Sequence, residues 1–70
     1  MKMQQVQSKN ISQVGYDVDE HVLRIIFSNG NTYEYAEVPE QIYRMFLTSQ
    51  SKGAFFRDQI KFRYAYTKVC

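Results

Sequence analysis

The dipeptide Asn29-Gly30 lies between two segments whose side chains alternate in character, and this arrangement restricts the possible folds more than any other feature. Residues 21–27 precede it and residues 32–36 follow it, and both have the period of two that is typical of β-strands. Because Asn and Gly adopt the positive φ angles of tight turns, we expect an antiparallel hairpin. The first of these strands is largely apolar on both faces, which predicts a central position in the sheet.

A third strand is expected over residues 11–16, before this hairpin. The segment Asp17-Val18-Asp19-Glu20 follows it directly, and Asp side chains accept hydrogen bonds from backbone amides two residues further on. This segment therefore predicts a turn that joins residues 11–16 to the central strand.

Two short helices are expected in the second half of the chain. Pro39 suits a first helical turn, so a helix begins near this residue. Ile42, Met45 and Phe46 then follow at the spacing of one helical face, which predicts packing on the sheet. Ser51 is a candidate N-cap for a second helix that extends to about residue 59.

The last segment, residues 60–66, alternates again and predicts an extended ending. In that conformation Phe62, Tyr64 and Tyr66 share one side, and Lys61 and Arg63 share the other. The expected fold class is α+β, an antiparallel three-stranded β-meander followed by two short helices and an extended C-terminal segment. We expect a single domain over residues 1–70, with an ordered core from about residue 8 to 67 and a polar leader before it.

Cysteine content and hydropathy indicate a cytoplasmic protein. Cys70 is the single cysteine, so the chain forms no internal disulfide or cysteine metal cage, and we expect a frayed terminal thiol in a reducing compartment. The first residues lack the apolar segment of a signal peptide, and no stretch approaches the roughly 20 apolar residues of a membrane span.

Catalytic and cofactor motifs are missing from the sequence. His21 is the single histidine, and no Cys or Asp stands near it at the spacing of a metal site or a catalytic triad. The three glycines form neither a phosphate-binding loop nor a dinucleotide fingerprint. We therefore predict a non-enzyme without cofactor or metal, in which His21 faces solvent.

Positive charge gathers in the last twenty residues, where five basic residues and one acidic residue give a net charge of +4. Aromatic residues are interleaved with these cations. A single-stranded nucleic acid requires this combination, because cations neutralise phosphates while aromatic faces stack on bases. The residues predicted to bind nucleic acid are Lys52, Arg57, Lys61 and Arg63 for phosphates, and Tyr64 and Tyr66 for stacking. Phe55, Phe56 and Phe62 are interpreted instead as core residues.

Tyr33 and Tyr35 lie two residues apart on a predicted strand, so their rings share one face. They either fill the core beneath the helices or form a stacking platform, and we favour the core because aromatic residues pack well on half-buried strands.

The sequence resembles the KTSC domain, a short module named for its occurrence at the C-terminus of some lysyl-tRNA synthetases. The resemblance covers about residues 8–66, and it implies the free-standing form that the family commonly takes in bacteria and their phages. The residues that carry it are Asn10-Ile11, Val14-Gly15-Tyr16-Asp17, Tyr33-Glu34-Tyr35, Val38-Pro39, Tyr43, Ser51-Lys52-Gly53, Phe56, Ile60 and Arg63-Tyr64.

The resemblance supplies no catalytic residue and suggests RNA or tRNA as the ligand. Tyr33, Tyr35, Ser51 and Gly53 are the motif residues that it marks, and Ala65 stands where the family often has a proline. The leading hypothesis is a non-catalytic module that binds RNA or other single-stranded nucleic acid. The alternative is a protein-interaction module, monomeric or weakly dimeric, that uses exposed tyrosines or a strand edge.

Overall fold

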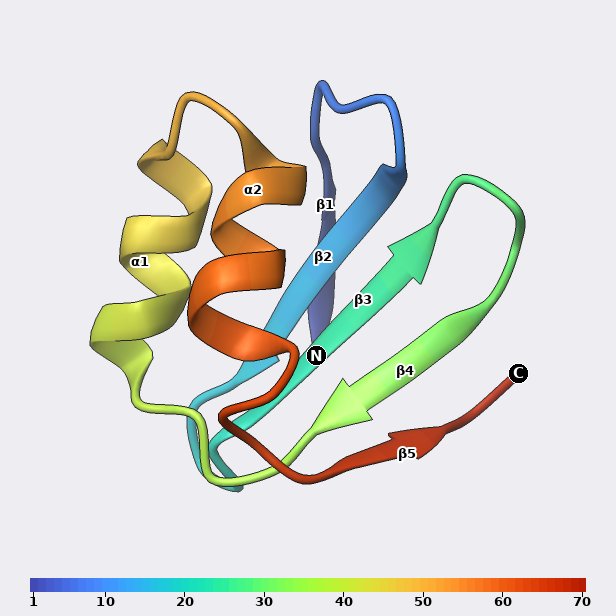
Figure 1. Cartoon of the computed structure of the whole chain (residues 1–70). Coiled ribbons are helices and arrows are strands. Elements are labelled where there is room, and N and C mark those ends of the chain that lie inside the picture. The colour runs from blue at the N-terminus through green and yellow to red at the C-terminus, as the bar shows by residue number, and fades with distance from the viewer.

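A single five-stranded antiparallel sheet forms the framework of the protein (Figure 1), and the computed structural model describes all 70 residues. Each strand pairs with its neighbours in the chain, so the sheet order is β1-β2-β3-β4-β5. The strands are β1 (Lys2–Gln5), β2 (Ile11–Asp17), β3 (Val22–Phe27), β4 (Thr32–Tyr35) and β5 (Tyr66–Lys68).

The helical segments, α1 (Glu40–Thr48), α2 (Lys52–Phe55) and η1 (Phe56–Ile60), lie on one face of the sheet. The segment η1 is a single π-helical turn, in which the amide of Lys61 donates to the carbonyl of Phe56 at 2.9 Å. These short helices cover the β2 side of the sheet and leave the same face of β4 and β5 open (Figure 1).

The core lies between the helices and the covered part of the sheet. Phe46 of α1 and Ile60 of η1 are fully buried, as are Leu23 and Ile25 of the central strand β3. The remaining buried apolar residues are Ile11, Val14, Tyr35, Val38 and Phe56. Burying a Leu, Ile or Phe side chain contributes about 1.5–3 kcal/mol, so these few residues supply most of the stability of the domain.

The two predicted hairpin connections are present. Oδ1 of Asp17 accepts the amides of Asp19 and Glu20 at 3.0 and 3.1 Å, as expected for an Asp-initiated turn. In the second hairpin only Gly30 takes a positive φ, 93°, and its amide donates to the carbonyl of Phe27. This connection is therefore a three-residue loop with glycine in the left-handed position, and the expected turn with two positive φ angles is wrong.

The opposite face of the sheet carries no helix. Arg24 and Glu34 pair across β3 and β4 on that face, and Nε of Arg24 lies 2.8 Å from Oε2 of Glu34. Val22 and Ile26 beside them are half-buried. The apolar content that the sequence shows on both sides of this strand is thus explained by its central position.

The α+β class and the first helix are confirmed, and the three expected strands are β2, β3 and β4, whereas the expected number of strands is wrong because the sheet has five. Residues 2–5, expected as a polar leader, form β1 and pair with β2. The expected extended segment over residues 60–66 is also wrong. Helical structure continues to Ile60, the chain then turns, and only Tyr66–Lys68 is a strand. The C-terminus is held by backbone hydrogen bonds between Thr32 and Cys70.

The N-cap of α2 generates a prediction about stability. Oγ of Ser51 accepts the amide of Ala54 at 3.2 Å, so Ser51→Ala leaves this amide without its partner. We expect a loss of about 1 kcal/mol in the free energy of unfolding, measured by urea denaturation. Gln50→Ala is the control because Gln50 is exposed and makes no side-chain hydrogen bond. Equal stability of the two variants contradicts the prediction.

Candidate nucleic-acid interface

Five aromatic rings contact one another in a closed circuit on the open part of the helix-covered face. We call this set the aromatic cluster. Neighbouring ring centroids lie 5.3–5.8 Å apart, and most pairs meet edge to face, the geometry that the ring quadrupoles favour. In order around the circuit, the members are Phe27, Tyr33, Tyr66, Tyr35 and Phe56.

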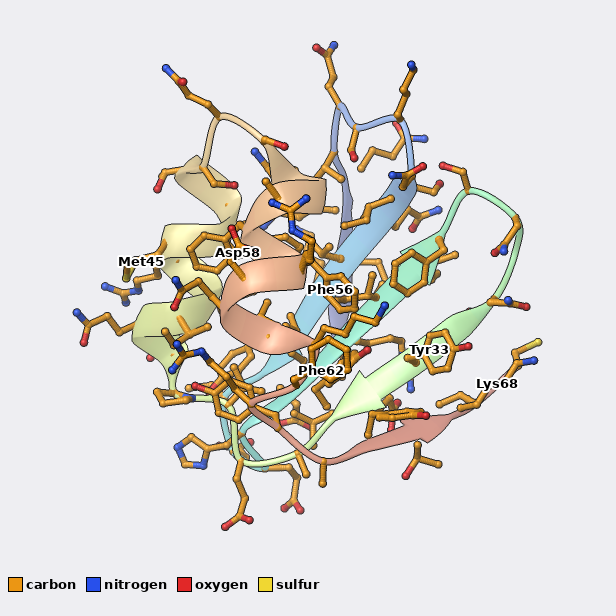
Figure 2. The ribbon with its side chains drawn as sticks, in the orientation of Figure 1. Tyr33, Met45, Phe56, Asp58, Phe62 and Lys68 are labelled. Carbon is orange, nitrogen blue, oxygen red and sulfur yellow. The ribbon has the colours of Figure 1, made fainter.

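Strand register brings these rings together. Tyr33 and Tyr35 share a face of β4, and β5 places Tyr66 directly opposite Tyr35. Phe56 reaches the cluster from η1, above the sheet (Figure 2). The cluster therefore joins three strands to the last helical turn.

The aromatic cluster forms the floor of a hollow of about 580 Å³. This hollow is one of two that adjoin on this face, and we call it the aromatic half of the groove. The exposed ring of Phe62 and the side chain of Lys61 stand at its rim, and Lys61 is the single charged residue of the lining. Polar side chains complete the lining: Asn10, Ser28, Asn29 and Asn31.

A second hollow of about 650 Å³ lies between the β1–β2 loop and α2. Four basic residues and no acidic residue line it, so we call it the basic half. The two halves share Asn10, Phe27, Phe56 and Lys61 and therefore adjoin, and we refer to them together as the groove. The cations of the basic half are Lys9, Lys52, Arg57 and Lys61.

The cations differ in how far the fold restrains them. Nζ of Lys52 donates to the carbonyl of Ser49 at 2.7 Å, and Nζ of Lys61 lies 5.3 Å from the centroid of the Phe62 ring. Arg57 pairs with Asp58 through Nε at 3.0 Å, and this hydrogen bond lowers the pKa of the Asp58 carboxyl. Because the pair is exposed, Arg57 remains available to an anion.

The structure brings together four of the six residues predicted to bind nucleic acid: Lys52, Arg57, Lys61 and Tyr66 line the groove. The other two lie outside it. Nε of Arg63 donates to the carbonyl of Asp58, and Tyr64 packs against the core.

The motif residues also lie in the groove. Tyr33 and Tyr35 line the aromatic half, and Ser51 and Gly53 line the basic half. The core interpretation is confirmed for Tyr35, which is 4% exposed, whereas Tyr33 is half-buried. A Cβ atom on Gly53 would meet only Nδ2 of Asn10, at 3.8 Å. Packing therefore does not require glycine at this position.

The three phenylalanines near the C-terminus were interpreted as core residues, and one of them is not. Phe56 is buried and Phe55 packs against the core, but Phe62 is 86% exposed, so the core interpretation is wrong for Phe62. The reason is local: helical structure ends at Ile60, and Phe62 lies in the turn that follows, where it lines the groove and stays outside the core (Figure 2).

Sequence reasoning missed Lys9, Asn10 and Phe27, which come from the first half of the chain. The bulged pairing of β2 with β3 and the bond from the amide of Ser28 to the carbonyl of Asn10 bring the β1–β2 loop to the groove. No local signal marks these residues as part of a binding site, since only the sheet register makes them neighbours of the last helix.

His21 lies away from the groove, in an exposed turn with a φ of 57°. It borders a shallow depression together with Glu20, Glu37 and Pro39. No group of three His, Cys, Asp or Glu side chains stands close enough to hold a metal ion. None of the helices has the length and apolar character needed to cross a membrane.

The architecture is that of small α+β domains with an antiparallel sheet and helices on one face. Within that class, the chain belongs to the KTSC domain family, which matches residues 7–64. The resemblance noted from the sequence is thereby confirmed.

Individual relatives agree with this assignment. A KTSC domain protein from Yersinia pestis, known from a crystal structure, superposes with a TM-score of 0.93 at 38% sequence identity, over 99% of this chain and 97% of that one. A protein from Tsukamurella paurometabola is 39% identical over 62 residues, which are 89% of this chain and 92% of the relative. An uncharacterized protein from Stutzerimonas stutzeri is 33% identical over 87% of this chain and 86% of its own.

Burial of Tyr35 within the aromatic cluster generates a prediction about pH. Burial, with smaller contributions from Tyr33 and Tyr66, raises the pKa of Tyr35 from 10.0 to about 12. The unfolded chain therefore loses this proton near pH 10 and the folded protein near pH 12. The stability of the fold is fully present below pH 10, and we expect it to fall by about 2–3 kcal/mol between pH 10 and 12.

Urea denaturation across this pH range measures the loss. Tyr35→Phe keeps the ring and removes the proton, so we expect its stability to fall less steeply above pH 10. Tyr64→Phe is the control, because Tyr64 lies outside the aromatic cluster and is not among the groups that raise the pKa of Tyr35. A wild-type pH dependence that Tyr35→Phe leaves unchanged contradicts the assignment.

Proposed function

We propose that this domain is a non-catalytic module that binds single-stranded nucleic acid, RNA in particular, in the groove. One observation carries the proposal: a hollow lined by cations without any acid adjoins a hollow floored by aromatic rings, and the two share four lining residues. This combination matches the two components of a nucleotide chain, since phosphates require cations and unpaired bases require aromatic faces.

Charge supports an anionic ligand. The chain contains seven acidic residues, and none of them lines either half of the groove. Three of the four cations around the basic half, Lys9, Lys52 and Lys61, have no acidic partner and repel one another, and a polyanion removes this repulsion while releasing its own counterions. A strand that follows the basic half would have its phosphates within reach of Lys9, Lys52 and Lys61.

The aromatic half of the groove favours a single-stranded nucleic acid as the ligand. Phe62 and Tyr66 present rings that are 86% and 61% exposed at the edge of the groove. The bases of a duplex are stacked on one another and do not offer their faces to such rings, whereas the bases of a single strand do. The association of the family name with lysyl-tRNA synthetases favours RNA and a cytoplasmic location.

A protein partner is the second candidate, favoured by the exposed Phe62 and by the open edge of the sheet at β5. Aromatic residues anchor protein interfaces, and an exposed strand edge accepts a further strand. The two candidates differ in their dependence on charge, because an apolar contact or a strand pairing is weakened only slightly when surface cations are removed.

Salt dependence and charge removal test the proposal together. Three to four phosphate contacts predict that log affinity falls with log salt at a slope of about −2 to −3. Lys52→Gln/Lys61→Gln removes two of these contacts, so we expect affinity for a labelled RNA octamer to fall roughly 10- to 30-fold at about 0.1 M salt. Fluorescence anisotropy measures both quantities.

The control for this experiment is Lys2→Gln/Arg44→Gln, which makes the same change in net charge with residues that do not line the groove. We expect it to bind as the wild type does apart from a small general effect. Equal losses in the two double variants, or no binding to RNA at low salt, contradict the proposal. A protein captured equally well by wild type and Lys52→Gln/Lys61→Gln favours the second candidate.

Gly53 provides a separate prediction, because its side-chain position is open toward the groove. Gly53→Ala removes the entropic cost of glycine in the first turn of α2, and we expect the free energy of unfolding to rise by up to about 1 kcal/mol. If the bound RNA strand passes close to the backbone of Gly53, the added methyl group weakens RNA binding several-fold.

Thr48→Ala is the matched control for Gly53→Ala. It improves helix propensity at the end of α1, outside the groove, so we expect RNA affinity to stay at the wild-type value. If Gly53→Ala binds RNA with unchanged affinity, the RNA strand does not approach α2. Calorimetry and anisotropy separate the effects on stability from those on binding.

A further inference from the structure

We propose that the groove reads base identity: its aromatic half takes one unstacked base, adenine by preference, and the side-chain amides of Asn10 and Asn31 bind the edge of that base. This inference rests on the proposed function and adds selectivity to it. A groove that used only cations and ring faces would accept any sequence.

Four polar side chains surround the aromatic cluster, and the fold uses two of them. Oδ1 of Asn29 accepts the amide of Asn31 at 3.0 Å, and Oγ of Ser28 donates to the carbonyl of Lys9 at 3.1 Å. The side-chain amides of Asn10 and Asn31 have no hydrogen-bond partner in the protein. These two amides are therefore available to a ligand.

The backbones that carry the free amides are fixed. The carbonyl of Asn10 accepts the amide of Ser28 at 2.8 Å, and the carbonyl of Asn31 accepts the amide of Phe27 at 2.8 Å. The backbones of Asn10, on the β1–β2 loop, and Asn31, on the β3–β4 hairpin, are thus both held at the end of β3. Little backbone ordering is required when they bind, and such preorganisation lowers the entropic cost of recognition.

The position of Asn10 connects the two halves of the groove, since it lines both. A nucleotide whose phosphate lies among Lys9, Lys52 and Lys61 would place its base next to this residue. The hydroxyls of Tyr33, Tyr35 and Tyr66 also lack partners in the protein. The two amides and these hydroxyls therefore remain free to bind a ligand next to a floor of aromatic rings, as a base with a flat face and a polar edge requires.

The chemistry of the amide selects the base. A side-chain amide offers a donor and an acceptor side by side, and adenine presents the matching pair at N6 and N7. The corresponding edge of guanine presents two acceptors, which suits Arg or Lys rather than Asn. A purine also covers more of a five-ring floor than a pyrimidine does. These two arguments together favour adenine.

A cationic ligand fits this site less well. Aromatic clusters also bind quaternary ammonium groups through the negative faces of their rings. Here, however, Lys61 stands at the rim and no acidic residue lines the groove. The net positive charge opposes a second cation and leaves a base as the ligand that the lining accommodates.

The experiment compares RNA heptamers that differ only at the central position, with uridine at the six flanking positions and adenine, guanine, cytosine, uracil or an abasic site in the middle. Fluorescence anisotropy at about 0.1 M salt measures the affinity of each. We expect the adenine heptamer to bind about 5- to 10-fold more tightly than the uracil and abasic heptamers. Asn10→Ala/Asn31→Ala should lose this preference and bind all five with the affinity that the wild type has for the uracil heptamer.

The control variant is Gln41→Ala, which removes an exposed side-chain amide from α1, outside the groove, and is expected to keep the preference for adenine. Equal wild-type affinity for all five heptamers overturns base reading and leaves the proposed function intact, because the strand is then held by its phosphates. A preference that survives in Asn10→Ala/Asn31→Ala overturns the role of the two amides. Absence of binding to every heptamer at low salt overturns the proposed function itself.

Discussion

The contact of Phe56 with Phe27 and Tyr35 is the interaction on which the rest of the structure depends. Phe56 is buried, and its ring meets those of Phe27 and Tyr35 edge to face at 5.3 and 5.6 Å. On one side this contact completes the core beneath η1, and on the other it forms part of the groove floor. A chain of 70 residues has too few helical residues to cover a five-stranded sheet, so the covered face ends at this ring and the groove begins there.

The placement of charge follows from the same division. The helical turn that supplies Phe56 also carries Arg57, and Lys61 comes directly after it, so packing of the ring brings both cations to the groove rim. Asp58, the one acidic residue of this segment, lies on the other side of the turn from Phe56 (Figure 2). The chain has a net charge of only +2, yet the groove lining carries four positive charges and no negative ones. Fold and electrostatics therefore depend on the same short segment.

Local sequence patterns predicted the parts of the fold that local chemistry decides. Asp17 and Gly30 marked the two hairpin turns, and the stripe that includes Phe46 marked α1. The strand β1 was missed because its polar residues gain order only by pairing with β2. The C-terminal pattern was misleading, since alternation cannot distinguish a strand from a helical turn followed by a loop.

The same limit applies to the groove. Its cations on the last helical turn are close in sequence and could be predicted, whereas Lys9, Asn10 and Phe27 arrive through sheet register alone.

The groove also carries features that lower stability and that a ligand would remove. Like charges around the basic half repel one another, and Phe62 keeps most of an apolar ring in water. A small domain has little stability to spare, so each of these two features lowers its margin. In the complex proposed above, phosphates would neutralise the cations, a stacked base would cover the rings, and the edge of that base would bind the amides of Asn10 and Asn31, which have no partner in the protein. One ligand class would thus account for the charge, the exposed rings and the free amides, whereas a purely apolar partner would account only for the exposed rings.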